Sequence, residues 1–426
     1  MTAAAAGATA GRASANGAVA LLLVIYTLNY LDRQIVNIVA EPIKTELGLL
    51  DWQLGLLTGL AFAVFYTVLG IPLARHADRA RTDRPVLIAA CLGVWSAMTA
   101  LCGLATTYVQ LLLARIGVGV GEAGCSPAAH SLISDIVPRE RRASAMAIYS
   151  MGIPLGKLFG LLIGGVIAQA LGWRMSFLLL GVPGVLLALV TWKLLPEPRR
   201  RRPVPAAPPV HTSIMASLRQ LTPIPTFWTI TFGGAFMSFL SYGQTAFLGS
   251  FFIRAHGVNV GEAGVMLGLA LGGAGAIGTW LGGRIADRWS RRDRRAYVLA
   301  PAVASGLGAL LFVTAILSRD LWPALAILAA ATALTSVWYG PVFATVQSLV
   351  EPDQRAMAAA VHLFFVNLIG LGLGPLTFGI LSDLLNSSGL GPAEGLRYAL
   401  LAGSATTVVA IGFFLVASRT IRADLK

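Results

Sequence analysis

Charged residues are scarce in this chain. Asp, Glu, Lys and Arg make up 12% of its 426 residues, whereas hydrophobic residues make up 56% and the mean hydropathy is +0.75. An average soluble protein is about 25% charged. The composition therefore excludes a soluble domain and predicts a protein that crosses a membrane several times.

Metal-binding and catalytic patterns are also missing. The three cysteines, Cys91, Cys102 and Cys125, lie in apolar runs without paired spacing, and the five histidines are scattered. Such cysteines are typical of small core residues. The sequence has neither a Gly-x-Ser-x-Gly nucleophile turn nor a phosphate-binding Gly-rich loop. We therefore expect no cofactor, no metal site and no enzymatic activity.

Apolar runs long enough to span a bilayer occur in two groups of six. The first group covers residues 17–40, 52–74, 85–105, 108–136, 143–169 and 175–195, and the second covers 226–253, 262–284, 297–317, 322–349, 356–383 and 396–418. We predict an all-α fold of twelve transmembrane helices, with six-helix bundles at 17–195 and 223–418. Residues 196–222, rich in Pro and Arg, are expected to be a cytoplasmic linker. Residues 1–16, which lack the basic start of a signal peptide, are expected to be a disordered tail, and 419–426 a second tail.

The basic residues predict the orientation. If both termini are cytoplasmic, most of the 32 Lys and Arg residues lie in cytoplasmic segments. This asymmetry follows the positive-inside rule, so the net charge of +13 reflects topology rather than nucleic-acid binding. The composition favours a bacterial inner membrane, and we expect a monomer. The few bases expected outside are Lys44, Arg174, Arg254, Arg319 and Arg397.

Two short patterns occur once in each group of spans. Ala77-Asp78-Arg79 recurs 209 residues later as Ala286-Asp287-Arg288, and Pro138-x-x-Arg141 recurs 214 residues later as Pro352-x-x-Arg355. Parallel six-helix repeats are the layout of one large class of secondary transporters, with the substrate site between the halves. The repeats therefore predict two pseudo-symmetric bundles around a central site.

Five ionisable residues lie in the middle of predicted spans, all in the first group: Asp32, Arg33, Arg115, Glu122 and Lys157. A charge at the bilayer centre costs about 2.5–3.5 kcal/mol on insertion scales, so such residues usually face a cavity and have a function. Asp32 and Arg33 point about 100° apart on one helix, so we expect them to meet different partners.

We predict that Asp32 and Glu122 carry protons and that Arg33 and Arg115 pair with them in alternation. Burial disfavours a charged carboxylate and a neighbouring Arg favours it, so a change of partner can bind or release a proton. The alternative is a set of static ion pairs that hold the bundle together. With Lys157 included, the five residues carry a net positive charge, which favours an anionic headgroup.

The second group of spans has no mid-span charge and offers polar and aromatic side chains instead. A charged wall that faces an apolar and aromatic wall suits an amphipathic substrate. His362 is expected to be a packed or solvated histidine. The predicted lining of the cavity is Asn29, Tyr30, Tyr242, Gln244, Trp338, Tyr339 and Asn367.

Two acidic residues end spans at the predicted cytoplasmic face. Asp78 and Asp287 are each followed by an arginine, Arg79 and Arg288. Each carboxylate could accept the positive N-terminus of a helix in the other half. These four residues are the predicted cytoplasmic gate.

Three segments resemble signatures of the major facilitator superfamily. They are the loop from Gly70 to Arg84, its counterpart from Gly282 to Arg292, and the run from Arg115 to Ala123. The resemblance covers essentially all twelve spans. Thr82 and Asp83 stand where the family usually has bases, which implies a weaker charge network in the first loop.

Within that superfamily, the run from Asn29 to Arg33 together with Gly121-Glu122-Ala123 most resembles the spinster-like branch. This resemblance implies export or exchange of lysophospholipids and sphingoid phosphates, coupled to protons at the matching acids. A similar Asn-Tyr-x-Asp-Arg opening occurs in organic-anion:cation symporters, so the branch stays open at this point.

The sequence as a whole predicts a proton-coupled transporter that works by alternating access and moves an amphipathic anion such as a lysophospholipid. Its expected partners are a small-molecule or lipid substrate, protons and the lipid bilayer. The alternatives are a proton-coupled symporter of a sugar acid or another small organic anion, and a multidrug-type exporter. A channel is disfavoured, because two repeats joined by a linker imply rocking rather than a static pore.

Overall fold

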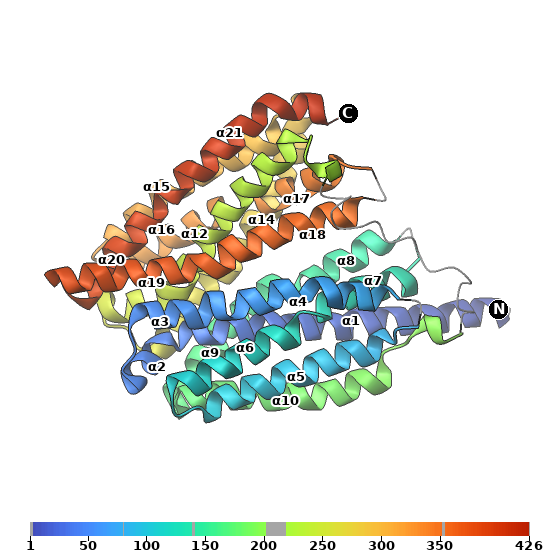
Figure 1. The fold of residues 1–426 in the computed structure, drawn as a ribbon, viewed down its shortest axis with the longest axis horizontal. Coiled ribbons are helices and arrows are strands. Elements are labelled where there is room, and N and C mark those ends of the chain that lie inside the picture. Colours follow the sequence, from blue (N-terminus) through green and yellow to red (C-terminus); the bar gives the residue numbers. More distant parts are fainter. Residues whose placement is uncertain (1–2, 80, 139–140, 202–218, 352–353, 426) are drawn as a thin grey trace.

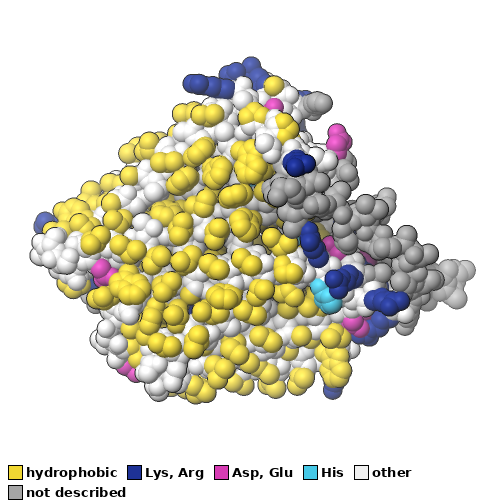
Figure 2. All heavy atoms as spheres, viewed as in Figure 1, with side chains coloured by type: hydrophobic (Ala, Val, Ile, Leu, Met, Phe, Trp, Pro, Cys, Tyr) yellow, Lys and Arg dark blue, Asp and Glu magenta, His cyan; other side chains and the backbone are white. Residues whose placement is uncertain are grey.

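A computed structural model describes residues 3–79, 81–138, 141–201, 219–351 and 354–425, and every regular element in these ranges is helical. Figure 1 shows two bundles, the N-terminal half in blue to green and the C-terminal half in yellow to red. Figure 2 shows a broad hydrophobic band across the molecule, with charged side chains gathered toward its ends. This distribution is the one expected of a protein surrounded by lipid.

The N-terminal half contains the first six spanning helices, several of them interrupted. Its elements are α1 (Ala3–Ile38), α2 (Ala40–Leu47), α3 (Asp51–Gly55), η1 (Leu56–Leu60), α4 (Ala61–Asp78), α5 (Arg84–Leu104), α6 (Tyr108–Glu122), α7 (Cys125–Ile136), α8 (Arg142–Ser150), α9 (Gly152–Leu171) and α10 (Trp173–Leu194), followed by the short η3 (Pro198–Arg201).

The C-terminal half repeats this layout. Its elements are α12 (Pro225–His256), α13 (Val260–Leu267), η4 (Gly268–Gly273), α14 (Ala274–Ser290), α15 (Ala296–Leu317), α16 (Leu321–Thr335), α17 (Tyr339–Ser348), α18 (Arg355–Phe365), η5 (Val366–Leu373), α19 (Gly374–Leu385), η6 (Asn386–Leu390), α20 (Gly391–Ser404) and α21 (Thr406–Asp424).

By length and hydropathy alone, nine stretches of the described chain could cross a membrane. The last of them, Met357–Asp424, holds two spanning helices, because the chain reverses at Gly389 and Gly391, both with positive φ. The pair α6–α7, interrupted at Ala123 and Gly124, and the Gly-, Ser- and Thr-rich α12 complete the set. The described helices thus form twelve membrane-spanning helices in two groups of six, as predicted.

The two halves meet at one end of the molecule, which we call the closed end, and diverge at the other, the open end, where both chain termini lie (Figure 1). Contacts between the halves join α9 to α13 and η4, and join α3 and η1 to α19 and η5. A Cβ added at Gly59 of η1 would lie 2.9 Å from the carbonyl oxygens of Leu371 and Gly372. Glycine is therefore required where the two halves approach backbone to backbone.

The ends of the chain differ from the sequence-based expectation. Helix α1 begins at Ala3, although we expected a disordered tail up to Asn16, because the Ala-rich start has a high helix propensity. At the other end, α21 continues to Asp424, whose carboxylate accepts the backbone N–H of Thr226 at the start of α12 (3.1 Å). Of the expected linker, residues 202–218 lie outside the described part of the chain.

Candidate functional site

The centre of the site is a buried ion pair between α1 and α6. Arg33 donates from Nε (2.8 Å) and from Nη2 (2.7 Å) to the same oxygen, Oε2, of Glu122. Both side chains are buried, and Glu122 Oε1 has no hydrogen-bond partner in the described structure. One carboxylate oxygen therefore holds Arg33, and the other is free to take a proton or a new donor.

Aromatic rings surround the Arg33 guanidinium. Its central carbon lies 4.9 Å from the ring centre of Tyr30, 4.8 Å from that of Phe62 and 4.5 Å from that of Tyr66. The electron-rich faces of such rings attract a cation, most strongly when water is excluded. The rings thus help to compensate the Arg33 charge beside its single carboxylate partner.

Asp32 has a different neighbour, as its direction on the helix predicted. Its Oδ2 accepts a hydrogen bond from Thr99 Oγ1 of α5 (3.1 Å), and the residue is 3% exposed. Neither Asp32 nor Arg115 forms an ion pair within the described residues, and Arg115 has two buried nitrogens, Nε and Nη1, without partners. In this conformation the carboxylates and arginines are thus arranged as one pair and two single charges.

Lys157 lies between two contact faces of α9. On one face, a Cβ at Gly156 would come 2.5 Å from the Cβ of Tyr30 on α1, and on the other face Leu158 packs against Gly272 of η4. One residue is a rotation of about 100°, so Lys157 points into the space between these faces. It makes no ion pair with any described residue, which leaves its ammonium group available at the interface of the halves.

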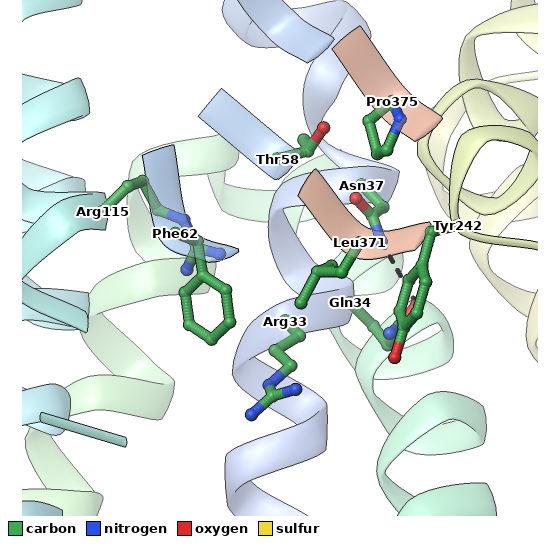
Figure 3. Close-up of a pocket in the computed structure, with 9 residues that line it drawn as sticks. All are labelled: Arg33, Gln34, Asn37, Thr58, Phe62, Arg115, Tyr242, Leu371 and Pro375. Atoms are coloured by element: carbon green, nitrogen blue, oxygen red, sulfur yellow. Dashed lines mark hydrogen bonds between the residues drawn. The ribbon is translucent and has the colours of Figure 1, made fainter. Parts of the chain in front are cut away.

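A small cavity lies where the site meets the C-terminal half (Figure 3). It is lined from the N-terminal half by Arg33, Gln34, Asn37, Thr58, Phe62 and Arg115, and from the C-terminal half by Tyr242, Leu371 and Pro375. Its volume of about 10 Å³ has room for roughly one water molecule. In this conformation the cavity is therefore too small to hold a substrate.

Six lining residues were missed from the sequence: Gln34, Asn37, Thr58, Phe62, Leu371 and Pro375. A signal existed for Asn37, which lies four residues after Arg33 and hence on the same helix face. Its amide donates to Gln34 Oε1 (3.3 Å; Figure 3). Thr58 and Phe62 become lining residues only through tertiary packing, which brings η1 against α1 and the centre of the Phe62 ring to 4.8 Å from the Arg33 guanidinium carbon.

The predicted lining residues differ in burial and in distance from the cavity. Tyr242 lines the cavity, and Tyr30, Gln244, Tyr339 and Asn367 are partly buried. Asn29 is buried beside Glu122 rather than exposed to a cavity.

Trp338 is not among the residues that line this small cavity, and its lining role stays a prediction. Its side chain is 1% exposed and belongs to a hydrophobic cluster inside the C-terminal half. The indole stacks on Tyr339, with the ring centres 4.2 Å apart. Of these two neighbouring residues, Tyr339 is the half-buried one. His362 is fully buried, with Nδ1 3.1 Å from Thr231 Oγ1, which agrees with a packed histidine.

A second polar network, not predicted from the sequence, joins the halves at the closed end. Arg254, at the end of α12, contacts Glu41 (2.6 Å) and Asp51 (2.7 Å) of the N-terminal half. Asp51 is 2% exposed and also accepts from Lys44 Nζ (2.5 Å) and from Ser382 Oγ (2.6 Å).

A helix terminus completes this network. The two carboxylate oxygens of Asp383, on α19, accept the backbone N–H groups of Asp51 (3.0 Å) and Trp52 (2.7 Å) at the start of α3. A carboxylate is favoured at a helix N-terminus because it meets unpaired N–H groups and the positive end of the helix dipole. The closed end is thus held by the ion pairs of Arg254 and by the helix N-terminus that Asp383 binds.

The four predicted gate residues at the open end make no ion pair with the other half in the described structure. Instead, Arg199 at the start of the linker donates to the backbone oxygens of Ala77 (2.9 Å) and Arg79 (3.1 Å) at the end of α4. Asp78 and Asp287 are exposed. Their predicted latch role remains a prediction, since it concerns a conformation with this end closed.

Comparison with known proteins gives three findings. The sequence pattern described as Major Facilitator Superfamily matches residues 22–375. The "MFS-type efflux pump" of Mycolicibacterium smegmatis is 37% identical over 403 residues, which cover 94% of this chain and 92% of that protein. The "Hexuronate transporter" of Bacillus subtilis is 26% identical over 376 residues, covering 84% and 85%.

Among solved structures, this chain is similar to a bacterial homolog of the human lysosomal transporter Spinster in an inward-facing conformation. The TM-score is 0.87 and the sequence identity 33%, over 96% of this chain and 97% of that one. The similar structure has the halves in the same general arrangement as here.

Proposed function

This chain belongs to the Major Facilitator Superfamily and resembles its spinster-like branch most, and we propose that it is a proton-coupled transporter of amphipathic anions. Members of this superfamily are transporters and not enzymes. The proposal concerns the substrate class, the coupling ion and the residues that perform the exchange.

The observation that carries the proposal is the pairing of Arg33 with one oxygen of Glu122. An ion pair out of water is stable only while both partners are present, because an unpaired buried charge is costly. A proton that binds Glu122 removes the partner of Arg33 and frees its guanidinium for an anionic substrate. Departure of the substrate restores the pair and releases the proton.

The charges around this pair support an anionic headgroup. Arg115 has unpartnered nitrogens, Lys157 makes no ion pair with a described residue, and Asp32 is held by a neutral threonine. Protonation of both carboxylates would raise the net charge of the site further. Tyr242 and Leu371 supply an aromatic and apolar surface on the opposite side for the remainder of the molecule.

The proposed orientation has both termini in the cytoplasm of a bacterial cell, with the protein acting as a monomer in the inner membrane. The closed end then faces outward and this conformation is inward-open. For outward opening, the contacts of Arg254 and Asp383 must break. The carboxylates of Asp78 and Asp287 would then bind helix N-termini of the opposite halves and close the cytoplasmic side.

Two alternative substrates are favoured by the relatives. The similarity to an efflux pump at 37% identity favours a multidrug-type exporter, and the similarity to a hexuronate transporter favours a sugar acid. The same Arg33–Glu122 exchange would serve a sugar acid, whose carboxylate could replace Glu122. A cationic drug would instead need the unpaired Asp32.

The test uses purified protein and four probes at pH 5.5 and 7.5: lysophosphatidylglycerol, sphingosine phosphate, glucuronate and a cationic dye. We expect the two lipid phosphates to raise the unfolding temperature in a pH-dependent manner, and the Glu122→Gln protein to lose the pH dependence. Stabilisation by glucuronate alone or by the dye alone would replace the lipid proposal with the corresponding alternative.

A further inference from the structure

At the open end of the N-terminal half, a buried arginine is paired with carboxylates of the same chain. Arg84, the first residue of α5, is fully buried and donates from Nε (3.0 Å) and Nη2 (2.6 Å) to the carboxylate of Glu197. Glu197 follows the last helix of this half and also accepts the Arg84 backbone N–H (2.9 Å). From α7, Ser131 (3.2 Å) and Asp135 (2.8 Å) contact Arg84 Nη1. The carboxylates of Glu197 and Asp135 thus occupy the positions around Arg84 that an external anion could otherwise take.

The C-terminal half has a cavity of about 240 Å³ at the related place. Its lining comes from the end of α14, the start of α15, the helix α17 and the chain just after α21: Ser290, Arg294, Tyr297, Ala344, Thr345, Ser348 and Leu425. Thr345 lies 214 residues after Ser131, the offset that also relates Pro138 to Pro352. The cavity therefore occupies, in the C-terminal half, the position that the Arg84 cluster occupies in the N-terminal half.

Among the residues that the structure describes, none that lines this cavity has a carboxylate side chain. Arg294 donates instead to the backbone oxygen of Leu425, the residue that follows α21. A carbonyl carries only a partial charge, so it compensates a guanidinium less well than the carboxylate of Glu197 compensates Arg84. As far as the described part of the chain shows, the C-terminal site thus keeps the cation and lacks the anion.

The surroundings increase the positive potential. The last turn of α14 and the connection to α15 together contain Arg288, Arg291, Arg292, Arg294 and Arg295 against two acids, Asp287 and Asp293. Asp293 is already paired with Arg422 of α21 (2.8 Å). Basic pockets between spanning helices at the cytoplasmic surface are suited to anionic lipid headgroups.

The hydroxyl groups in the lining point to a second feature of the ligand. Ser290, Thr345 and Ser348 each donate their hydroxyl proton to a backbone carbonyl of their own helix. Their oxygen lone pairs are then left as acceptors for donors in the cavity. A ligand that combines a phosphate with free hydroxyl groups would satisfy both Arg294 and these oxygens.

We propose that this cavity binds a phosphodiester or phosphomonoester that carries a hydroxylated headgroup, with Arg294 on the phosphate and the α14 and α17 hydroxyls on the headgroup. An anionic phospholipid of the adjacent leaflet and a soluble sugar or glycerol phosphate share this chemistry. The site is separate from the Arg33–Glu122 pair and does not depend on the proposed transport function.

The experiment is a thermal-unfolding and native mass-spectrometry titration of delipidated, full-length protein. The probes are phosphatidylglycerol, phosphatidylcholine and glycerol 3-phosphate. We expect phosphatidylglycerol to bind and to raise the unfolding temperature, phosphatidylcholine to do neither, and Arg294→Gln to weaken phosphatidylglycerol binding at least tenfold. The matched control is Arg291→Gln, which removes a charge from the same turn but not from the cavity lining.

A second variant covers the case in which Arg294→Gln unfolds. Ser348→Phe keeps every charge and fills the cavity, so it should abolish binding as well. Binding of glycerol 3-phosphate with the same dependence on Arg294 supports the site and identifies a soluble ligand. Equal losses in the Arg294 and Arg291 variants, or unchanged binding in Ser348→Phe, would overturn the proposal.

Discussion

Removal of Arg254 should shift the protein toward an outward-open conformation. In this structure Arg254 is the cation shared by Glu41 and Asp51, at 2.6 and 2.7 Å, and its own side chain is 7% exposed. Breaking a buried pair by removal of one partner costs about 3–5 kcal/mol. Asp51 retains Lys44 and Ser382, and Glu41 is partly exposed, so we expect about 2 kcal/mol.

A free-energy change of about 2 kcal/mol alters the ratio of the two conformations roughly 30-fold, since 1.4 kcal/mol is a factor of ten. We propose Arg254→Met, which keeps an apolar stem, with spin labels at His76 on α4 and Gln347 on α17. Both positions are exposed at the open end and belong to different halves. Pulsed electron paramagnetic resonance should show a new population at shorter distance, because closure of this end accompanies opening of the other.

The matched control is Arg174→Met. Arg174 pairs with Glu46 at the same end of the molecule, but both residues belong to the N-terminal half and are about a third to a half exposed. Loss of that pair should leave the distances unchanged. An unchanged distribution in Arg254→Met, or the same change in both variants, would refute the reasoning.

Three further variants test other parts of the structure. Glu122→Gln should abolish proton-driven accumulation in proteoliposomes while substrate exchange persists, because Arg33 then lacks its charged partner; normal accumulation would exclude Glu122 as the proton carrier. Gly59→Val should separate η1 from η5 and raise the accessibility of introduced cysteines at the closed end, since its Cβ would lie 2.9 Å from two carbonyl oxygens; unchanged accessibility would contradict the close contact. The Arg174 guanidinium and the Trp173 indole lower the pKa of Glu46 below 4.5, so its carboxylate stabilises the fold above that pH and less as the pH falls. Glu46→Gln should therefore lower the free energy of unfolding at pH 7 by less than about 1 kcal/mol, because the pair is exposed, and the difference measured by thermal unfolding should shrink as the pH is lowered toward 3.

The spans and the intramembrane charges were predictable because each is a local pattern. A long apolar run identifies a spanning helix, and a charge inside it is conspicuous, so the sequence alone was enough to select Asp32 and Glu122. Their partners were partly predictable: the 100° separation on α1 correctly sent Asp32 and Arg33 to different neighbours, Thr99 and Glu122.

Contacts between distant segments were not predictable in the same way. Arg254 meets Asp51 across 203 residues, and nothing in either local pattern distinguishes Arg254 from other bases expected at the outer surface. The burial of Trp338 was not predictable for the same reason, because it depends on contacts with residues distant in the sequence. Helix periodicity gives the direction of a side chain relative to its helix, but which direction faces the cavity depends on how the whole half packs.

The backbone contacts at the closed end have a thermal consequence. Gly59 faces the carbonyls of Leu371 and Gly372, and Gly264 of α13 faces the carbonyl of Leu161, so backbone rather than side chains makes the contact at these two points. Exposure of apolar surface raises the heat capacity of a transition, whereas exposure of polar backbone lowers it. Separation at these two backbone contacts should therefore add less to the heat-capacity change than separation of the buried apolar side chains around them. The glycine contacts would then contribute little to any temperature dependence of the balance between the two conformations.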